Sequence, residues 1–183
     1  MAAQRADAVR SRERVLAVAK DVIDRDGPAV SLDRVARAAG VGSATLYRHF
    51  PTRLHLLEAV FAQEAHALAA AAAALPGSQD GASAVRSWAR RLVVEAIASR
   101  GLGAALVAAG IEQTSSSDCR GLIARATDTL LHDPAVAASV RPGVRGEDVV
   151  DIASALAVVA EGDAERACRL MDQCLAGFVA EAR

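Results

Sequence analysis

The sequence predicts an all-α fold, with a three-helix head at the N-terminus and a helical-bundle body after it. Apolar residues make up 52% of the 183 residues and aromatic residues only 3%, which is typical of helices that pack through small side chains. Apolar positions recur at spacings of three and four residues along most of the chain, and the alternation that marks β-strands is nearly absent. We therefore expect a head over residues 1–50 and a body over residues 51–183.

The first predicted helix spans about residues 7–25. Its apolar stripe consists of Val15, Val18, Ala19, Val22 and Ile23. Gly27 and Pro28 follow, and neither residue continues a helix well. This pattern predicts an amphipathic helix with one buried face.

A helix-turn-helix is predicted directly after it. Ser31 is a preferred N-cap residue for a short second helix, and Gly40 closes that helix. Gly42 permits a tight turn, after which a third helix runs from Ser43 to His49. Leu46 is expected in the shared core together with Val35 and Val41, which leaves part of the third helix facing outward.

The outward face of the third helix has the chemistry of DNA recognition. It consists of Thr45, Tyr47, Arg48 and His49, while Ser43 and the small Ala44 let the N-terminus of the helix approach the DNA backbone closely. Arg48 can donate two hydrogen bonds to guanine, and Thr45 can bond a base or contact a thymine methyl group. Tyr47 and His49 can donate to phosphate oxygens. The competing interpretations are a solvated Arg48, a half-buried surface Tyr47 and a His49 that caps helix carbonyls.

Charge is divided unevenly along the chain. Through Arg53 there are ten Lys and Arg against six Asp and Glu, whereas the remainder has eleven against sixteen, which gives +4 and −5. A basic first quarter and an acidic remainder suit a head that binds nucleic acid and a body that does not.

The body is predicted to be helical throughout. Pro51 and Thr52 begin a fourth helix that ends near Ala74. The later helices are expected at residues 82–99, 102–109, 118–132, 147–160 and 163–180. Pro134 predicts that the helix before it either stops at His132 or kinks there.

Residues 30–61 read VSLDRVARAAGVGSATLYRHFPTRLHLLEAVF and resemble the helix-turn-helix region of TetR-type (TetR/AcrR) transcriptional regulators. The matching elements are the apolar second helix, the Ala-Gly-Val turn, Thr-Leu-Tyr in the third helix and His-Phe-Pro-Thr-Arg before the fourth. The resemblance covers residues 8–62 closely. It implies that the third helix enters the major groove of double-stranded DNA.

The resemblance also implies particular site residues. Positions that commonly touch bases or phosphates in that family are matched by Thr45, Tyr47, His49 and Arg53. The resemblance also suggests phosphate or minor-groove contacts from Ser31 and Arg34 at the start of the second helix, and from Arg5, Arg10 or Arg12 in the N-terminal arm. The chain departs from the family pattern after Thr52, where Leu54 and His55 replace the usual acidic residues, so no capping box is predicted there.

The last two predicted helices, residues 147–160 and 163–180, are broadly apolar and would expose a large stripe on a monomer. The resemblance implies that they pair with their copies in a homodimer. A two-fold dimer would place two reading helices in adjacent major grooves, roughly 34–36 Å apart or somewhat more, on a near-palindromic operator.

The resemblance further implies a ligand-responsive repressor whose body binds a small molecule. The alternative is a DNA-binding regulator without such an effector, either constitutive or controlled by a protein partner. The polar or aromatic groups that could orient a ligand in the body are Trp88, Arg91, Glu95, Gln113 and His132. Simple packing of Trp88 and a solvated Glu95 are the competing interpretations.

Other function classes have little support. The sequence shows no Ser-His-Asp or Cys-His set, no phosphate loop and no metal cluster, so we expect neither an enzyme nor a cofactor. The three cysteines lack metal-ligand spacing and are expected to be reduced, mostly buried thiols. The start of the chain has no secretory signal, and the longest apolar run, residues 102–111, is too short for a membrane span. We therefore expect a cytoplasmic protein with no membrane role.

Overall fold

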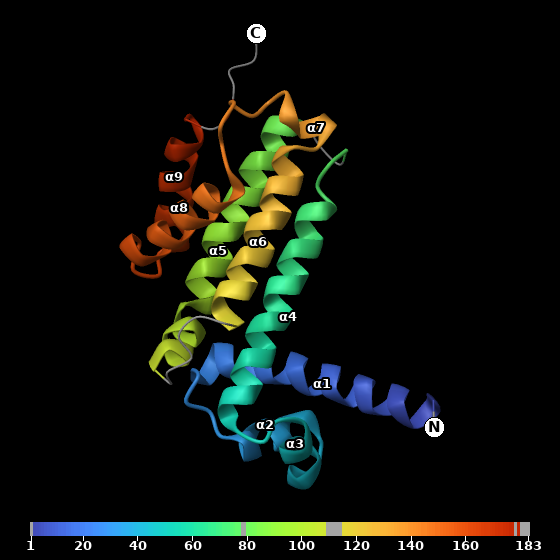
Figure 1. The fold of residues 1–183 in the computed structure, drawn as a ribbon. Helices are drawn as coiled ribbons and strands as arrows, with labels where there is room; N and C mark the ends of the chain where they lie inside the picture. The colour runs from blue at the N-terminus through green and yellow to red at the C-terminus, as the bar shows by residue number, and fades with distance from the viewer. Residues whose placement is uncertain (1, 78–79, 109–114, 178, 180–183) are drawn as a thin grey trace. The chain divides into compact units, whose positions relative to one another are not determined.

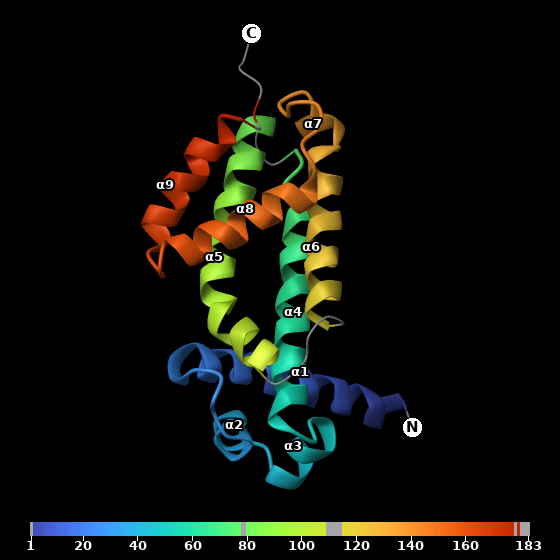
Figure 2. The ribbon, with the colours of Figure 1, turned by 60° about the vertical axis from the view of Figure 1, so that its left-hand side comes forward.

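The computed structural model describes residues 2–77, 80–108, 115–177 and 179, and it describes the side chains of residues 11–77, 80–99, 118–177 and 179. Within these ranges the secondary structure consists of nine helices and one isolated bridge between Val140 and Val179 (Figures 1 and 2). The all-α prediction is therefore confirmed. The chain divides into two compact units, Met1–Glu64 with Gly101–Ser116 and Ala65–Arg100 with Ser117–Arg183.

The first unit contains a helix-turn-helix. Its elements are α1 (Ala2–Asp26), α2 (Leu32–Ala39), α3 (Ser43–His49) and the beginning of α4 (Arg53–Ala73), which continues into the second unit. The Ser31 side chain accepts a hydrogen bond from the Arg34 backbone N–H, and Gly40 closes α2 in the left-handed conformation at φ 63°. Both caps and the bounds of α3 agree with the sequence prediction.

The core of the first unit fixes the angle between α2 and α3. Val35 and Leu46 are fully buried, and Phe50, which follows α3, is 1% exposed. Further buried side chains come from α1 and α4: Val15, Leu16, Ala19, Val22, Ile23, Leu56, Leu57 and Val60. Packing in this core therefore involves the Leu46 side of α3 and leaves the polar residues of the helix accessible.

The start of α4 is capped despite the missing acidic residue. The His55 backbone N–H donates to Thr52 Oγ1 at 3.3 Å, and His55 Nδ1 lies 2.7 Å from the same oxygen. A histidine thus occupies the place where a capping box has a glutamate. The sequence prediction correctly excluded the usual box, but it did not predict this substitute.

The second unit is a helical bundle. Besides the remainder of α4, it contains most of α5 (Gly81–Ala108) and α6 (Ser115–Leu131), with α7 (Pro134–Ala137), α8 (Gly146–Val159) and α9 (Ala164–Leu175). Trp88 of α5 donates from Nε1 to Thr127 Oγ1 of α6 at 3.0 Å, and both side chains are buried. In both views α9 lies beside α5, and Arg90 of α5 pairs with Asp172 of α9 (Figures 1 and 2).

Two glycines allow close approach of helices in this unit. A Cβ atom on Gly146, at the start of α8, would meet the Ala124 carbonyl oxygen of α6 and lie 2.7 Å from the Asp128 nitrogen. The Gly146 N–H instead donates to Asp128 Oδ1, so a carboxylate from α6 caps α8. Gly81 at the start of α5 is similarly close to the backbone of α7.

The structure corrects two predicted elements. Residues 82–99 and 102–109 were expected to form two helices, but α5 is continuous from Gly81 to Ala108. A glycine inside a helix costs only about 1 kcal/mol, so Gly101 and Gly103 are not sufficient to end one. The last helix was expected to reach residue 180, but α9 ends at Leu175, and Val179 pairs instead with Val140.

Pro134 marks a stop rather than a kink. Helix α6 ends at Leu131, and Pro134 is the first residue of the short α7, where the Asp133 side chain caps the Ala135 N–H at 2.9 Å. No helix among the described residues is long and apolar enough to cross a membrane.

Candidate nucleic-acid interface

Helix α3 presents its polar side to solvent and its apolar side to the core. Leu46 is fully buried, whereas Tyr47 is 45% exposed. The exposed residues of this face are Ser43, Ala44, Tyr47 and Arg48, and the half-buried ones are Thr45 and His49. The structure therefore leaves all six predicted residues of the third helix exposed or half-buried, and only Leu46 is fully enclosed.

The cations around α3 differ in how far they are neutralised. Arg34 Nη2 lies 2.7 Å from Asp26 Oδ2, so a carboxylate at the end of α1 already pairs with this predicted phosphate contact. Arg53 Nη1 donates to the Ala29 carbonyl oxygen at 3.3 Å and keeps its charge. The Ser31 hydroxyl oxygen is engaged in capping α2. Sequence reasoning could not predict the Arg34–Asp26 pair, because it depends on the crossing of α1 and α2.

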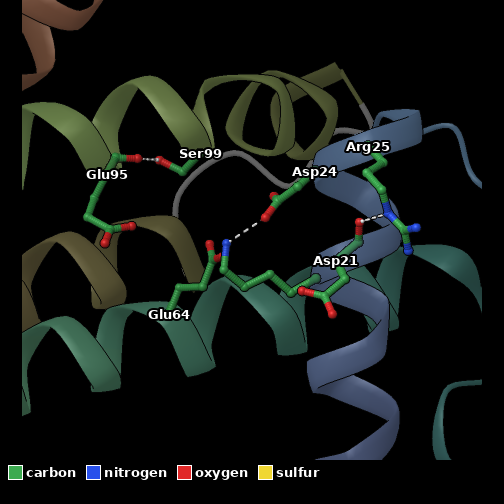
Figure 3. Close-up of polar contacts among 7 residues, drawn as sticks. Asp21, Asp24, Arg25, Glu64, Glu95 and Ser99 are labelled. Carbon is green, nitrogen blue, oxygen red and sulfur yellow. Dashed lines mark hydrogen bonds and ion pairs between the residues drawn. The ribbon is translucent and has the colours of Figure 1, made fainter. Parts of the chain in front are cut away.

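Lys20, the single lysine of the chain, joins α1 to α4. Its ammonium lies 2.7 Å from Glu64 Oε1 and 2.9 Å from Asp24 Oδ2 (Figure 3). Partial burial of Lys20 opposes its charge, but the hydrogen bonds to Glu64 and Asp24 outweigh this effect and raise the pKa of Lys20 above its ordinary value. Lys20 is thus committed to a structural ion pair and is not available to DNA.

Arg12 lies beside the C-terminal end of α3. Its guanidinium carbon is 5.4 Å from the centroid of the Phe50 ring, and the centroid of the neighbouring His49 ring lies 6.3 Å from that of Phe50, with the two rings tilted by 51°. Arg12 was expected as a phosphate or minor-groove contact, but its contact with the Phe50 ring was not predicted. A signal was present, since Arg12 lies one helical turn before the buried Val15 and Leu16 and therefore extends the inner face of α1.

The described body residues that were predicted to orient a ligand differ in their surroundings. Trp88 is 1% exposed and its ring N–H is satisfied by Thr127. Arg91 and Glu95 are neighbours on α5, with an Nε–Oε1 distance of 4.0 Å. His132 is exposed, and its Nδ1 lies 2.8 Å from the Asp128 carbonyl oxygen of its own helix. Gln113 lies outside the described residues.

Two further groups in the second unit have shifted ionisation. The Arg90 guanidinium, hydrogen-bonded to the Asp172 carboxylate, lowers the pKa of Asp172. Burial raises the pKa of the Cys119 thiol. All three cysteines are free; Cys119 is buried, whereas Cys168 and Cys174 are half-buried.

Comparison with known proteins identifies both parts of the chain. Residues 15–60 match the family described as bacterial regulatory proteins, tetR family. Residues 80–180 match the family described as transcriptional regulator SbtR-like, C-terminal domain. The two matches together cover the helix-turn-helix and nearly all of the body.

Two solved structures resemble the chain over almost its full length. The TetR transcriptional regulator SCO0520 from Streptomyces coelicolor is 35% identical, with 93% of this chain and 99% of that chain covered and a TM-score of 0.76. The TetR transcription regulatory protein from Mycobacterium vanbaalenii is 32% identical, with 97% and 99% covered and a TM-score of 0.71.

A curated relative matches over a shorter span. The uncharacterized HTH-type transcriptional regulator TtgW from Pseudomonas putida is 39% identical over 64 residues, which cover 34% of this chain and 48% of that relative. The chain therefore spans less than half the length of this relative. The folds and the matches define a DNA-binding transcriptional regulator of the helix-turn-helix class, not an enzyme. The chain belongs to the TetR family of bacterial transcriptional regulators.

Proposed function

We propose that the protein is a ligand-responsive repressor that binds a near-palindromic operator as a homodimer. The observation that carries the proposal is the face of α3. Six accessible residues, Ser43, Ala44, Thr45, Tyr47, Arg48 and His49, lie on a helix whose opposite side is locked by the buried Leu46. A short helix held in this way and carrying donors on its free side has the form of a helix that reads the major groove.

Within this face, Arg48 is the proposed base reader. Among the described residues no carboxylate pairs with Arg48, so its guanidinium keeps both its charge and its fork of N–H donors. Thr45 is the second candidate for a base contact. Tyr47, His49 and Arg53 are proposed to contact phosphates, together with the start of α2 at Ser31 and Arg34. The Asp26 partner of Arg34 makes that residue the weakest cation of the set.

Dimerisation through α8 and α9 is supported by the exposed apolar surface of α8. Val158 is 62% exposed and Val159 55%, near the C-terminal end of that helix. Helix α9 differs from the expectation of a broadly apolar helix, because Glu165, Arg169 and Gln173 are all exposed on its outer side. The dimer contact is therefore proposed to be centred on α8, with α9 contributing polar contacts at the edge.

Control by a small molecule is proposed from the family and from the helical body. A ligand that favours the released form about 10⁴-fold would change the ratio of bound to released protein from about 99:1 to about 1:99, and partial induction needs less. Trp88 is part of the packed core, so almost none of its surface is available to a ligand. Arg91 and Glu95, which are accessible on α5, are the more suitable polar contacts.

The decisive experiment is selection of bound sequences from a pool of random duplexes by the full-length protein. We expect enrichment of a near-palindrome with half-sites about one helical turn apart. Arg48→Ala and Thr45→Ala should lose preference at defined base positions, each costing about 1–3 kcal/mol of discrimination. Arg25→Ala is the matched control, because this exposed arginine at the end of α1 donates to the Asp21 carbonyl of its own helix (Figure 3).

Failure to enrich any palindrome would contradict the proposal that a dimer binds the DNA. Fluorescence anisotropy with the selected duplex then tests control by ligand, since a true inducer must lower operator affinity. Unchanged affinity across broad panels of small molecules would favour the alternative, a regulator that is constitutive or controlled by a protein partner.

A further inference from the structure

Arg12 is a cation of α1 that lies close to the end of the proposed reading helix. Phe50 directly follows α3 and is 1% exposed, so the core fixes the position of its ring. The Arg12 guanidinium carbon lies 5.4 Å from the centroid of this ring. This distance is within the range of a cation–π contact. The buried ring therefore holds a positive charge beside the last turn of α3.

The Arg12 guanidinium keeps its hydrogen-bonding capacity. In the part of the chain that the structure describes, no carboxylate pairs with Arg12, whereas Lys20 is paired with Glu64 and Arg34 with Asp26. An arginine has five N–H donors, and contact with the face of a ring uses none of them as a conventional hydrogen bond. Arg12 thus combines a held position with an uncompensated charge.

We propose that Arg12 binds a phosphate of the DNA backbone beside the C-terminal end of α3, and that Phe50 is the positioning residue that holds it there. The inference rests on the proposed function and goes beyond the resemblance, which suggests Arg5, Arg10 or Arg12 as phosphate or minor-groove contacts. It selects Arg12 and a phosphate partner on the basis of the contact with Phe50. A guanidinium already held by a ring loses less rotamer freedom on binding than a free one. Phosphate is the favoured acceptor because Arg matches its geometry with two parallel N–H bonds.

The test measures the salt dependence of DNA binding by full-length Arg12→Gln. Two duplexes are used, one enriched in the selection from random sequences and an unrelated one of the same length. The logarithm of the binding constant falls with the logarithm of salt concentration, with a slope of about −0.9 for each phosphate neutralised. We expect Arg12→Gln to make the slope less negative by about 0.9 on both duplexes, because one phosphate is no longer neutralised and phosphates are the same in every sequence.

Arg14→Gln is the matched control, because Arg14 is an exposed arginine on the same helix and has no ring contact among the described side chains. Its slope should stay close to that of the unaltered protein. Phe50→Leu retains an apolar core residue but removes the ring, and it should shift the slope in the same direction as Arg12→Gln. The double variant should shift it no further than Arg12→Gln alone, because both changes act on one contact.

The outcomes separate this inference from the proposed function. If the unaltered protein binds neither duplex, the proposed function fails. If it binds and Arg12→Gln leaves both slopes unchanged, the function stands and the Arg12 contact is overturned. An equal change of slope in Arg14→Gln would overturn it as well. So would a lower melting temperature of Arg12→Gln without a change in slope, because Arg12 would then only cover the Phe50 ring. Arg12 is exposed, so Arg12→Gln is expected to fold, and the test does not require that Phe50→Leu also folds.

Discussion

A buried hydrogen bond joins α5 to α6 in the body. Thr127 is fully buried, accepts from the Trp88 ring N–H and donates to the Ile123 carbonyl oxygen at 2.8 Å. Both polar groups of the pair are therefore satisfied inside an apolar cluster. Removal of the hydroxyl would leave the Trp88 N–H buried without a partner, which is costly because water cannot replace it there.

We predict that Thr127→Val lowers the free energy of unfolding by about 1–3 kcal/mol. The matched control is Thr129→Val on the same helix. Thr129 makes the same kind of bond to a carbonyl four residues back, at 2.9 Å, but its side chain is exposed. That control should change stability by less than about 0.5 kcal/mol. Urea unfolding followed by circular dichroism measures both, and equal effects would contradict the role of the Trp88 contact.

The candidate site was predictable from sequence in the identity of its residues but not in their pairing. The inward Leu46 and the outward Tyr47 and Arg48 follow from helical periodicity, which acts over one turn. The ion pair of Arg34 with Asp26 and the contact of Arg12 with Phe50 depend on how α1 crosses α2 and α3. No local sequence pattern predicts such contacts, because each joins side chains from different helices.

At the scale of the elements, the start of α8 depends on the absence of a side chain. Gly146 is buried against α6, where Asp128 caps its N–H. A methyl group there would collide with backbone atoms of Ala124 and Asp128, which cannot move without displacing α6. The close approach of the two helices therefore requires glycine.

We predict that Gly146→Ala destabilises the protein by about 1–3 kcal/mol, the usual cost of overpacking. Gly121→Ala in α6 is the opposite case. The added methyl would meet only the end of the flexible Arg125 side chain, at 3.1 Å. Because alanine favours a helix over glycine, Gly121→Ala should stabilise by up to about 1 kcal/mol. Thermal melts compare the two variants, and a Gly146→Ala variant as stable as the original would show that α8 can shift away from α6.

Element boundaries were predictable where caps are strong and local. Ser31 and Gly40 bound α2 as expected, because a side-chain acceptor and a left-handed glycine each act within one turn. The division of α5 was wrong because glycines inside a helix only weaken it. The end of α9 was wrong because the bridge between Val140 and Val179 competes with further helix, and no pattern near residue 175 reveals this partner.

At the scale of the whole molecule, the charge is divided between the two ends of the sequence. The residues through Arg53 carry +4 and the remainder −5, although the total is only −1. The excess of positive charge is associated with the helix-turn-helix, which suits attraction to phosphate. The acidic remainder suits a body that does not bind DNA, in which the apolar surface of α8 is the proposed dimer contact.

We predict that Val158→Glu shifts the protein from dimer to monomer, since the valine face that the proposed dimer would bury would acquire two unpaired charges across a two-fold axis. Sedimentation equilibrium gives the dissociation constant, which should rise at least about tenfold, the equivalent of about 1.4 kcal/mol. Val94→Glu is the control, because this valine is also exposed, at 44%, but lies on α5. A dimer equally stable in both variants would place the interface elsewhere.

The buried pair of Trp88 and Thr127 also gives the protein an intrinsic fluorescent probe. Trp88 is the single tryptophan of the sequence, and its indole is enclosed between α5 and α6. Intrinsic tryptophan emission therefore comes from the body alone, while the helices proposed to face DNA contribute none. Adding a selected duplex will alter this emission only if binding at α3 is felt at the α5–α6 contact. Titrations with DNA and with a small molecule, both followed by tryptophan emission, then show whether the two act on one shared conformation.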